Sequence, residues 1–410
     1  MNKSLQNKLI DKELEFSARN YHPLPVVIKK GKGVWLWDTD GNKYLDMMSA
    51  FSAVSHGHAH PELIKVLHQQ SELLGITSRA FYSNTLGPFL EKLINISDLE
   101  VALPMNTGTE AVETAIKAAR RWAYKTKRVE INKAEIIVAE GNFHGRTTTI
   151  ISFSTDNESK EGFGPYTPGF VAIKYGNIDS LKNAITKNTA AVLVEPIQGE
   201  AGIIIPESKW LPEVRKICTE NNVLLILDEI QSGLGRTGKM FAYEHSSIKP
   251  DGLILGKALG GGLLPVSCFL STKEVMQWLV PGSHGSTFGG NPLAAAIGKR
   301  SLEVIQEDKL VENSNQQGKY FLDELKKIES PILSEIRGKG LWIGVEIDTN
   351  FINGRNMCKR LLKKGILSKE THASTIRFAP PLIIKKKEID WAVLVIKETL
   401  KEIEKEHNKH

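Results

Sequence analysis

A lysine within a run of glycines is the residue of this sequence with the clearest chemical potential. Lys257 stands in the segment Gly256–Gly262, directly after the short apolar run 252–256. A lysine amine becomes nucleophilic when it is desolvated, and small neighbours allow a flat ring to approach it. The pattern therefore favours a lysine that holds a carbonyl compound as a Schiff base, with a surface lysine in a glycine-rich turn as the alternative.

A pair of acids, Asp228 and Glu229, follows the apolar run 223–227. At the carboxyl end of a parallel strand, such acids face the crevice where ligands bind. A carboxylate there suits a magnesium ion beside a nucleotide, or the ring nitrogen of a pyridine-type cofactor, which it keeps protonated. An ordinary acid at a strand end is the third interpretation.

An ATP-hydrolysing enzyme, the alternative from a different class, is disfavoured by the surroundings of the lysine. A phosphate-binding loop has four residues between its first glycine and the Gly-Lys pair, and a Ser or Thr follows. Here three residues separate Gly252 from Gly256, and Ala258 occupies the hydroxyl position. The lysine also follows the acidic strand, whereas a nucleotide-binding lysine usually precedes it.

Two further loops offer groups that bind anions and rings. Gly108 and Thr109 stand at the start of residues 110–125, whose apolar residues have helical spacing. The free N–H groups of a helix start suit a phosphate, although a simple N-cap is also consistent with the pattern. In the second loop, Phe143 suits stacking on a ring and Arg146 suits a carboxylate, with a surface ion pair as the alternative.

Three alternating histidines, His56, His58 and His60, form a second pattern that suggests a metal. On a strand they would share a face. Gly57 and Pro61 instead indicate a loop that runs into a helix, and no cysteine or carboxylate joins the set. We expect no metal site.

Alternating strands and helices must position these groups. Short apolar runs bounded by polar residues, Gly or Pro predict buried strands at 134–140, 190–195, 223–228 and 252–256. Helix patterns separate them at 110–125, 178–186 and 207–221. This alternation predicts an α/β fold with a mainly parallel sheet in a large domain and helices on both of its faces.

From about Asn291 the pattern changes to that of a smaller α+β domain. Its expected elements are a helix at 292–307, a segment at 336–347, a helix near 356–364, a strand at 375–378 and a charged helix from 387 to about 406. Residues 34–37 and 44–46 flank an Asp40-Gly41 turn and predict a hairpin that joins this domain. The expected division is 1–50, 51–295 and 296–410.

Composition fits a globular enzyme. Charged residues make up 24% of the 410 residues and the formal net charge is +6, but the basic runs are short and mixed with acids. We therefore expect no nucleic acid partner. The three cysteines lie far apart, and residues 1–19 lack the apolar core of a secretion signal. No apolar run approaches the length of a membrane span, so we expect a cytoplasmic protein without membrane contact.

The order of the motifs resembles the class III aminotransferases, enzymes of fold type I that use pyridoxal 5′-phosphate. The resemblance extends from about Arg19 to Leu400 and rests on NTGTEA (106–111), GNFHGRT (141–147), VEPIQGEAG (194–202), LILDEIQSGLGRTG (225–238), LGKALGGG (255–262) and GSTFGGNP (285–292). It implies that Lys257 carries the cofactor and moves a proton, and that Asp228 pairs with the ring nitrogen. The further cofactor contacts that it implies are Gly108, Thr109, Phe143, His144, Gln231, Ser286 and Thr287, the last from the second subunit of a homodimer.

Four segments are similar to the family members that act on ornithine: YHPLPV (21–26), TSRAFYSN (77–84), PMNTG (104–108) and IRFAPPL (376–382). This likeness implies transfer of the δ-amino group of L-ornithine to 2-oxoglutarate, with N-acetylornithine or 4-aminobutyrate as alternative donors. The substrate contacts that it implies are Tyr21, Phe51, Arg146, Glu195, Glu200 and Arg377. Glu200 is expected to neutralise Arg377 while the amine donor is bound.

The sequence departs from this pattern at two positions. Phe51 stands where the ornithine-specific members have a tyrosine, so one hydrogen bond worth about 1 kcal/mol is absent. His144 stands where some relatives have a tryptophan, a difference that we expect to matter less. A non-catalytic protein of the same fold is a further alternative, which the intact Lys257 and Asp228 oppose.

Overall fold

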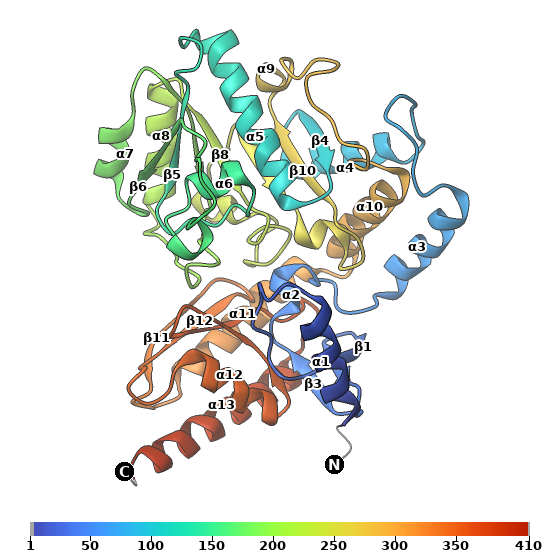
Figure 1. Ribbon diagram of the computed structural model, residues 1–410, viewed down its shortest axis with the longest axis vertical. Helices are drawn as coiled ribbons and strands as arrows, with labels where there is room; N and C mark the ends of the chain where they lie inside the picture. The colour runs from blue at the N-terminus through green and yellow to red at the C-terminus, as the bar shows by residue number, and fades with distance from the viewer. Residues whose placement is uncertain (1–3, 409–410) are drawn as a thin grey trace.

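Three sheets organise the chain. The computed structural model describes residues 4–408. Figure 1 shows an upper part built on a seven-stranded sheet and a lower part that contains two four-stranded sheets. Helix α1 (Leu5–Phe16) and helix α13 (Lys386–His407), which are nearest the two ends of the chain, both lie in the lower part (Figure 1). The expected α/β class is confirmed.

The large sheet has the strand order β4-β10-β9-β8-β7-β5-β6. Strands β5 to β9 pair in parallel, and β10 is antiparallel to both of its neighbours. The bounds are β4 Val101–Met105, β5 Glu135–Ala139, β6 Phe170–Ile173, β7 Thr189–Val194, β8 Leu224–Asp228, β9 Gly252–Leu255 and β10 Ser267–Ser271. The predicted strands therefore lie where the apolar runs placed them.

Helices cover both faces of this sheet because its strands are apolar on both faces. In β5, Ile136 and Val138 pack in one buried cluster with the apolar side of helix α5 (Gly108–Trp122). Ile137 and Ala139 point the other way and belong to the cluster that contains helix α8 (Trp210–Glu220). The remaining helices of this part are α3 Pro61–Leu73, α4 Leu86–Ser97, α6 Thr148–Ser152, α7 Ile178–Ala184, α9 Lys273–Met276 and α10 Pro292–Glu307.

The lower part joins the two ends of the chain in one sheet. The predicted hairpin is confirmed, with strands β2 (Trp35–Asp38) and β3 (Lys43–Asp46) antiparallel. Strand β3 also pairs in parallel with β13 (Ile366–Leu367), and β1 (Ile28–Lys32) completes the sheet. The other elements are β11 Leu333–Gly338, β12 Ile343–Ile347, β14 Lys369–Thr371, β15 Thr375–Phe378, α11 Leu310–Lys326 and α12 Gly354–Lys363.

The single segment expected at 336–347 is instead two strands. β11 and β12 form an antiparallel pair, and Gly340, with a φ of 57°, lies in the turn between them. A side chain at Gly340 would meet the backbone of Thr237 at 2.4 Å, so the turn needs glycine for space as well as for its backbone angle.

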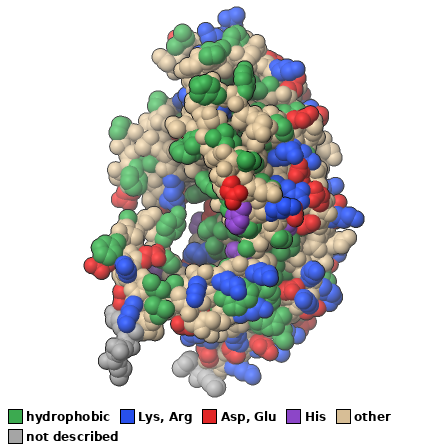
Figure 2. Space-filling view, turned by 90° about the vertical axis from the view of Figure 1, so that its right-hand side faces the viewer, with side chains coloured by type: hydrophobic (Ala, Val, Ile, Leu, Met, Phe, Trp, Pro, Cys, Tyr) green, Lys and Arg blue, Asp and Glu red, His purple; other side chains and the backbone are tan. Residues whose placement is uncertain are grey.

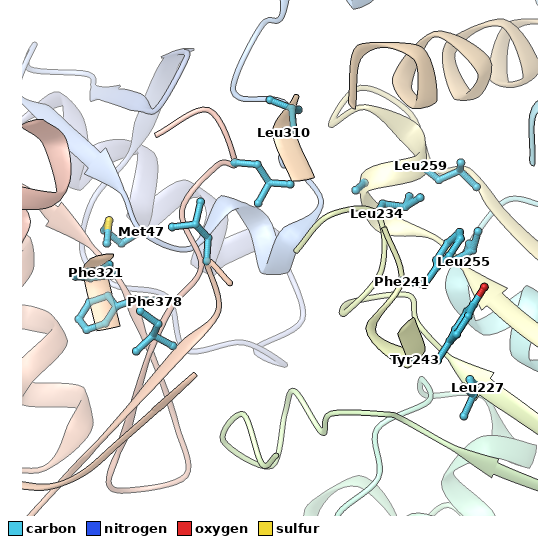
Figure 3. Packing of buried hydrophobic residues seen from close by; sticks show 14 of the residues in the cluster. Met47, Leu227, Leu234, Phe241, Tyr243, Leu255, Leu259, Leu310, Phe321 and Phe378 are labelled. Atoms are coloured by element: carbon cyan, nitrogen blue, oxygen red, sulfur yellow. The ribbon is translucent and has the colours of Figure 1, made fainter. Parts of the chain in front are cut away.

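One hydrophobic cluster extends through both parts. Figure 3 shows Met47, Phe321 and Phe378 on the side of the small sheets, and Leu255 and Leu259 on the side of the large one; all belong to the same cluster. The predicted domain boundaries near residues 50 and 295 stay a prediction. Between residues 4 and 408, none of the helices combines the length and apolar character that crossing a bilayer requires.

Candidate active site

A cavity of about 300 Å³ lies at the carboxyl ends of the parallel strands. The crevice outside these strand ends is the usual ligand site of such sheets. Most of the predicted site residues line it together: Tyr21, Gly108, Thr109, Phe143, His144, Arg146, Glu195, Glu200, Asp228, Gln231 and Lys257. Residues up to 236 positions apart in the chain thus share one cavity, because four successive strands end at it.

Lys257 follows β9 and begins a short 3-10 turn, Lys257–Gly260. Its backbone has a φ of 44°, a left-handed conformation that is unfavourable for a side chain and is found most often at functional sites. Desolvation lowers the pKa of the Lys257 amine to about 8. The predicted nucleophile is therefore in an environment that increases its neutral fraction near physiological pH.

Asp228, at the end of β8, is buried against His144. The His144 Nδ1 and Asp228 Oδ2 atoms are 2.7 Å apart, and Asp228 Oδ1 accepts a hydrogen bond from the Ile230 N–H. Burial by itself lowers the pKa of His144, but the hydrogen bond and the charge of Asp228 outweigh it, so the pKa is raised. The sequence predicted both residues near the cofactor but not the bond between them.

Glu195 lies at the end of β7 and braces the loop that carries Phe143. Its carboxylate accepts hydrogen bonds from the backbone N–H groups of Phe143 and Gly199, at 3.0 and 3.1 Å. Burial raises the pKa of Glu195 to about 7. The residue lines the cavity as predicted, and its two backbone contacts hold the walls of the cavity in place.

The start of helix α5 combines an N-cap with unoccupied donors. The Thr107 hydroxyl accepts from the Glu110 N–H, and the Glu110 carboxylate accepts from the Thr107 N–H, which forms a capping box. Within residues 4–408, no acceptor meets the N–H groups of Gly108 and Thr109. A side chain at Gly108 would lie 2.9 Å from Ile230 Cδ1. The helix start is thus both capped and open to an anion.

The buried Arg377 and the half-buried Glu200 form an ion pair beside the cavity. The Arg377 Nη1 and Glu200 Oε1 atoms are 2.7 Å apart, and Gln231 Nε2 lies 3.3 Å from the same oxygen. Burial raises the pKa of Glu200, but the charge and hydrogen bond of Arg377 outweigh it, so the pKa is held below its ordinary value. Glu200 is therefore a carboxylate that neutralises Arg377.

Phe51 connects this ion pair to the lysine. Its ring centroid is 5.0 Å from the Arg377 guanidinium and 6.0 Å from the Lys257 amine. The turn that carries it, α2 (Ser49–Ser52), has φ values of 43°, 49°, 57° and 73° along its residues, and none of them is glycine. A left-handed helical turn of this kind is costly for L-amino acids, and no sequence signal predicted it.

Two predicted cofactor residues lie outside the cavity. Ser286 accepts a hydrogen bond from Asn106 Nδ2 at 2.9 Å, next to the start of α5. Thr287 lines a separate open depression with residues 76–79. The chain itself therefore does not bring Thr287 to the lysine.

The alternating histidines have separate partners: His56 contacts Ser301, His58 contacts Asp46 and His60 contacts Asp308. Among residues 4–408, no group of three or more His, Cys, Asp or Glu side chains is arranged to hold a metal ion. The three histidines thus serve to hold chain segments together.

A second cavity, of about 950 Å³, adjoins the first and shares Tyr21 and Arg146 with it. Its wall is mostly apolar and includes Phe51. Figure 2, which looks at the side that is on the right in Figure 1, shows the molecule hollowed at mid-height with basic and histidine side chains near the opening. A substrate therefore has space next to the lysine.

The set of groups around the first cavity fits pyridoxal phosphate. A desolvated lysine amine matches its aldehyde, and the buried Asp228 carboxylate matches its ring nitrogen. The ring of Phe143, 38% exposed, offers a face for stacking, and the free N–H groups of α5 match its phosphate.

Comparison with known proteins agrees with this fit. The family profile described as aminotransferase class III matches residues 16–400. The ornithine aminotransferase of Brevibacillus brevis is 55% identical over 397 residues, which cover 97% of this chain and 99% of that protein.

Two solved structures have the same fold. The ornithine aminotransferase from Toxoplasma gondii, with pyridoxal phosphate partly occupying its active site, has a TM-score of 0.97 and 40% identity, and the match covers 98% of this chain and 96% of that one. The acetylornithine aminotransferase from Elizabethkingia anophelis has a TM-score of 0.88 and 41% identity, and the match covers 98% of this chain and 100% of that one. This chain therefore belongs to the class III aminotransferases, enzymes that depend on pyridoxal phosphate.

Proposed function

We propose that this chain transfers the δ-amino group of L-ornithine to 2-oxoglutarate, which yields glutamate and glutamate 5-semialdehyde, the precursor of pyrroline-5-carboxylate. The observation that carries the proposal is the ion pair of Arg377 and Glu200 beside Lys257. The names of the relatives support it. N-acetylornithine is the second candidate donor, since one structural relative acts on it.

The proposed cofactor contacts follow the cavity wall. Lys257 would bind pyridoxal phosphate covalently, Asp228 would hold its ring nitrogen, and Phe143 would hold its ring. The N–H groups of Gly108 and Thr109 would hold the phosphate. When bound, the cofactor withdraws electrons from the carbon that bears the amino group and so allows a proton to leave it.

In this proposal the protein supplies proton transfer and charge. Lys257 Nζ would take the proton from the substrate carbon, which requires a neutral amine. The raised pKa of His144 favours its protonated form beside Asp228, and the contact between the two side chains fixes the position of that carboxylate. Glu195 keeps the Phe143 loop at the cavity.

Arg377 and Glu200 account for the use of two different substrates at one site. Ornithine presents an ammonium group at its reacting end, whereas glutamate and 2-oxoglutarate present a carboxylate next to theirs. A bare arginine repels the first and attracts the others. Because Glu200 covers Arg377 and is held by only a few contacts, it neutralises the arginine for ornithine and moves aside for the acids.

Glu200→Ala is therefore expected to raise kcat/KM for glutamate relative to ornithine by about 10-fold or more, since a charge-assisted hydrogen bond is worth about 1.5–3 kcal/mol. The isosteric Glu200→Gln should shift the ratio in the same direction. The measurement is the rate of each half-reaction, followed by the absorbance of the bound cofactor. Glu303→Gln, which breaks a surface ion pair with Arg300, is the control. An unchanged ratio in both Glu200 variants would refute this role.

The donor is tested by an absorbance titration of the purified enzyme without a keto acid. Ornithine, N-acetylornithine and 4-aminobutyrate are added separately, and we expect ornithine to convert the cofactor band at the lowest concentration. If another amine converts half of the cofactor band at a lower concentration, that amine replaces ornithine as the proposed donor, and the proposed role of Lys257 is unaffected. The absence of any cofactor band after addition of pyridoxal phosphate would contradict the whole proposal.

The rate at which cofactor-free protein captures pyridoxal phosphate should increase as the pH rises through about 8. Desolvation lowers the pKa of Lys257 to about this value, and only the neutral amine attacks an aldehyde. Glu200 acts in the opposite direction on this pKa, so Glu200→Ala should move the midpoint to lower pH. Stopped-flow absorbance across a pH series measures both midpoints. A midpoint near the value of an ordinary lysine, about 10.4, would show that the amine is not desolvated.

The active unit is proposed to be a homodimer in the cytoplasm. Thr287 and the neighbouring Ser286 lie outside the cavity of their own chain, as expected if they complete the phosphate site of a second copy. The side chains of Phe81, Tyr82 and Phe288 near this depression are 71%, 104% and 56% exposed, so an apolar surface is available for that contact. The three cysteines are free thiols, which suits a reducing compartment.

A further inference from the structure

Arg236 is a fully buried arginine, with a relative exposure of 0%, that the proposed chemistry does not use. It lies in the segment after β8, eight residues beyond Asp228 and five beyond Gln231. Within residues 4–408 its guanidinium forms no ion pair. A buried charge without a carboxylate partner destabilises the fold unless its donors are satisfied, so its contacts indicate its purpose.

The guanidinium donates to four oxygens in three separate segments. Nη1 contacts the carbonyl oxygens of Leu341 and Pro380 at 2.8 and 2.7 Å. Nη2 contacts the hydroxyl oxygens of Ser49 and Ser55, each at 3.2 Å. A single side chain therefore joins the strand end beyond Arg377 to the segment that contains the left-handed turn.

The two serines transmit this contact to the turn. The Ser49 hydroxyl donates to the carbonyl oxygen of Ala379 at 2.6 Å, and the Ser55 hydroxyl donates to that of Ser52 at 2.9 Å. Both protons are thus used, and the serine oxygens accept from Arg236. Asp46 holds the other side of the turn, because its Oδ1 accepts from the N–H groups of Met48 and Ser49.

The turn requires such support because four successive non-glycine residues have a positive φ. Backbone strain of this kind persists only where surrounding contacts outweigh it. Phe51 of this turn lines the second cavity, and its ring lies 5.0 Å from Arg377 and 6.0 Å from Lys257. Any relaxation of the turn therefore moves the wall on which the substrate lies.

We propose that Arg236 is a positioning residue that fixes the Phe51 turn against the Arg377 strand and thereby sets the selectivity of the enzyme among amine donors. Arg236 acts through Ser49 and Ser55 and does not touch the substrate. Arginine suits this task because its planar group donates in two directions at once, whereas the single nitrogen of lysine does not reach both pairs of acceptors. The choice of donors in the test rests on the proposed function above.

The test compares Arg236→Lys with the double variant Ser49→Ala/Ser55→Ala in the full-length holoenzyme. Ser314→Ala is the matched control, because the buried Ser314 hydroxyl contacts the backbone oxygen of Arg236 and not its guanidinium. For each protein, kcat and KM are measured separately for ornithine and 4-aminobutyrate, together with the affinity for pyridoxal phosphate.

Arg236→Lys should lower the ornithine to 4-aminobutyrate ratio of kcat/KM by about 10-fold, mainly through KM, with cofactor affinity unchanged. If Arg236 only stabilises the fold, Arg236→Lys lowers Tm and leaves this ratio unchanged. This is the result that we expect for the control Ser314→Ala. The serine variant should reproduce the shift, and its combination with Arg236→Lys should shift the ratio no further, because residues in one network are not additive.

The proposal is overturned if both Arg236→Lys and the serine variant keep the parental ratio, or if their effects on the ratio add. If Arg236→Lys does not fold, the serine variant decides alone, since it leaves the guanidinium bound to Leu341 and Pro380. If the parental enzyme itself prefers another amine, the proposed function fails, and the same variants then test the positioning role with that amine.

Discussion

Replacing Lys257 with alanine is expected to lower turnover by roughly 10³-fold or more. The change removes the group that we propose binds the cofactor covalently and moves the proton, and general acid–base catalysis alone contributes roughly 10²–10⁴-fold. The cavity should remain intact, because Lys257 follows a buried strand and its amine makes no hydrogen bond to another group among residues 4–408. Turnover with ornithine and 2-oxoglutarate, measured at saturating pyridoxal phosphate, gives the size of the loss.

Chemical rescue distinguishes loss of the base from loss of the fold. A small amine such as methylamine should restore part of the activity of Lys257→Ala, since it enters the space of the missing side chain and takes the proton. Lys249→Ala is the control, because Lys249 forms a surface ion pair with Asp98 away from the cavity. If Lys257→Ala keeps more than about one tenth of the activity, the proposed role is contradicted, because loss of a general acid–base group is expected to cost roughly 10²–10⁴-fold.

Asp228→Asn should reduce kcat by roughly 10²-fold while the enzyme still binds its cofactor. The asparagine keeps the shape but loses the negative charge that we propose binds the ring nitrogen, and a hydrogen bond to a charged group is worth about 1.5–3 kcal/mol. The affinity for pyridoxal phosphate should change less than kcat, because Lys257, Phe143 and the start of α5 are unaltered.

The same variant should also lower the pKa of His144. Burial lowers this pKa, and Asp228 is the main group that raises it. NMR titration of the His144 ring checks this change independently of activity. A variant with normal kcat would show that the Asp228 charge has no part in catalysis. An unchanged His144 titration would show that this charge does not raise the pKa of His144.

Four of the seven strands in the large sheet, β5, β7, β8 and β9, were predictable because they are short, apolar and clearly bounded, whereas β4, β6 and β10 were missed. Helix α10 was predictable as well, since Asn291 caps its first turn through the Ala294 N–H and Pro292 occupies the first helical position. The antiparallel placement of β10 was not predictable from its residues, because strand direction depends on the connection. Helix α1 was missed because none of its residues is buried, so it lacks the apolar stripe that marks a packed helix.

The site was predictable where single residue types imply a chemistry, as with Lys257 and Asp228. The bond between His144 and Asp228 joins residues 84 positions apart, and no local pattern records such a contact. The left-handed turn at Ser49–Ser52 was also missed, because its sequence contains no glycine. The contacts that support its conformation come from Asp46, which precedes the turn, and from Arg236, which is distant in the sequence.

The pairing of β3 with β13 has a consequence for synthesis of the protein. Leu45 and Ile366 are partners in this sheet, so β3 can complete its pairing only after β13, more than 300 residues later in the chain, has been made. Ser49 likewise donates to Ala379, 330 positions further on. When all strands of the seven-stranded sheet have been made, the segment that contains Phe51 still lacks its contacts with β13 and Ala379. The contacts that complete the Phe51 turn therefore form only after synthesis has reached the last part of the chain.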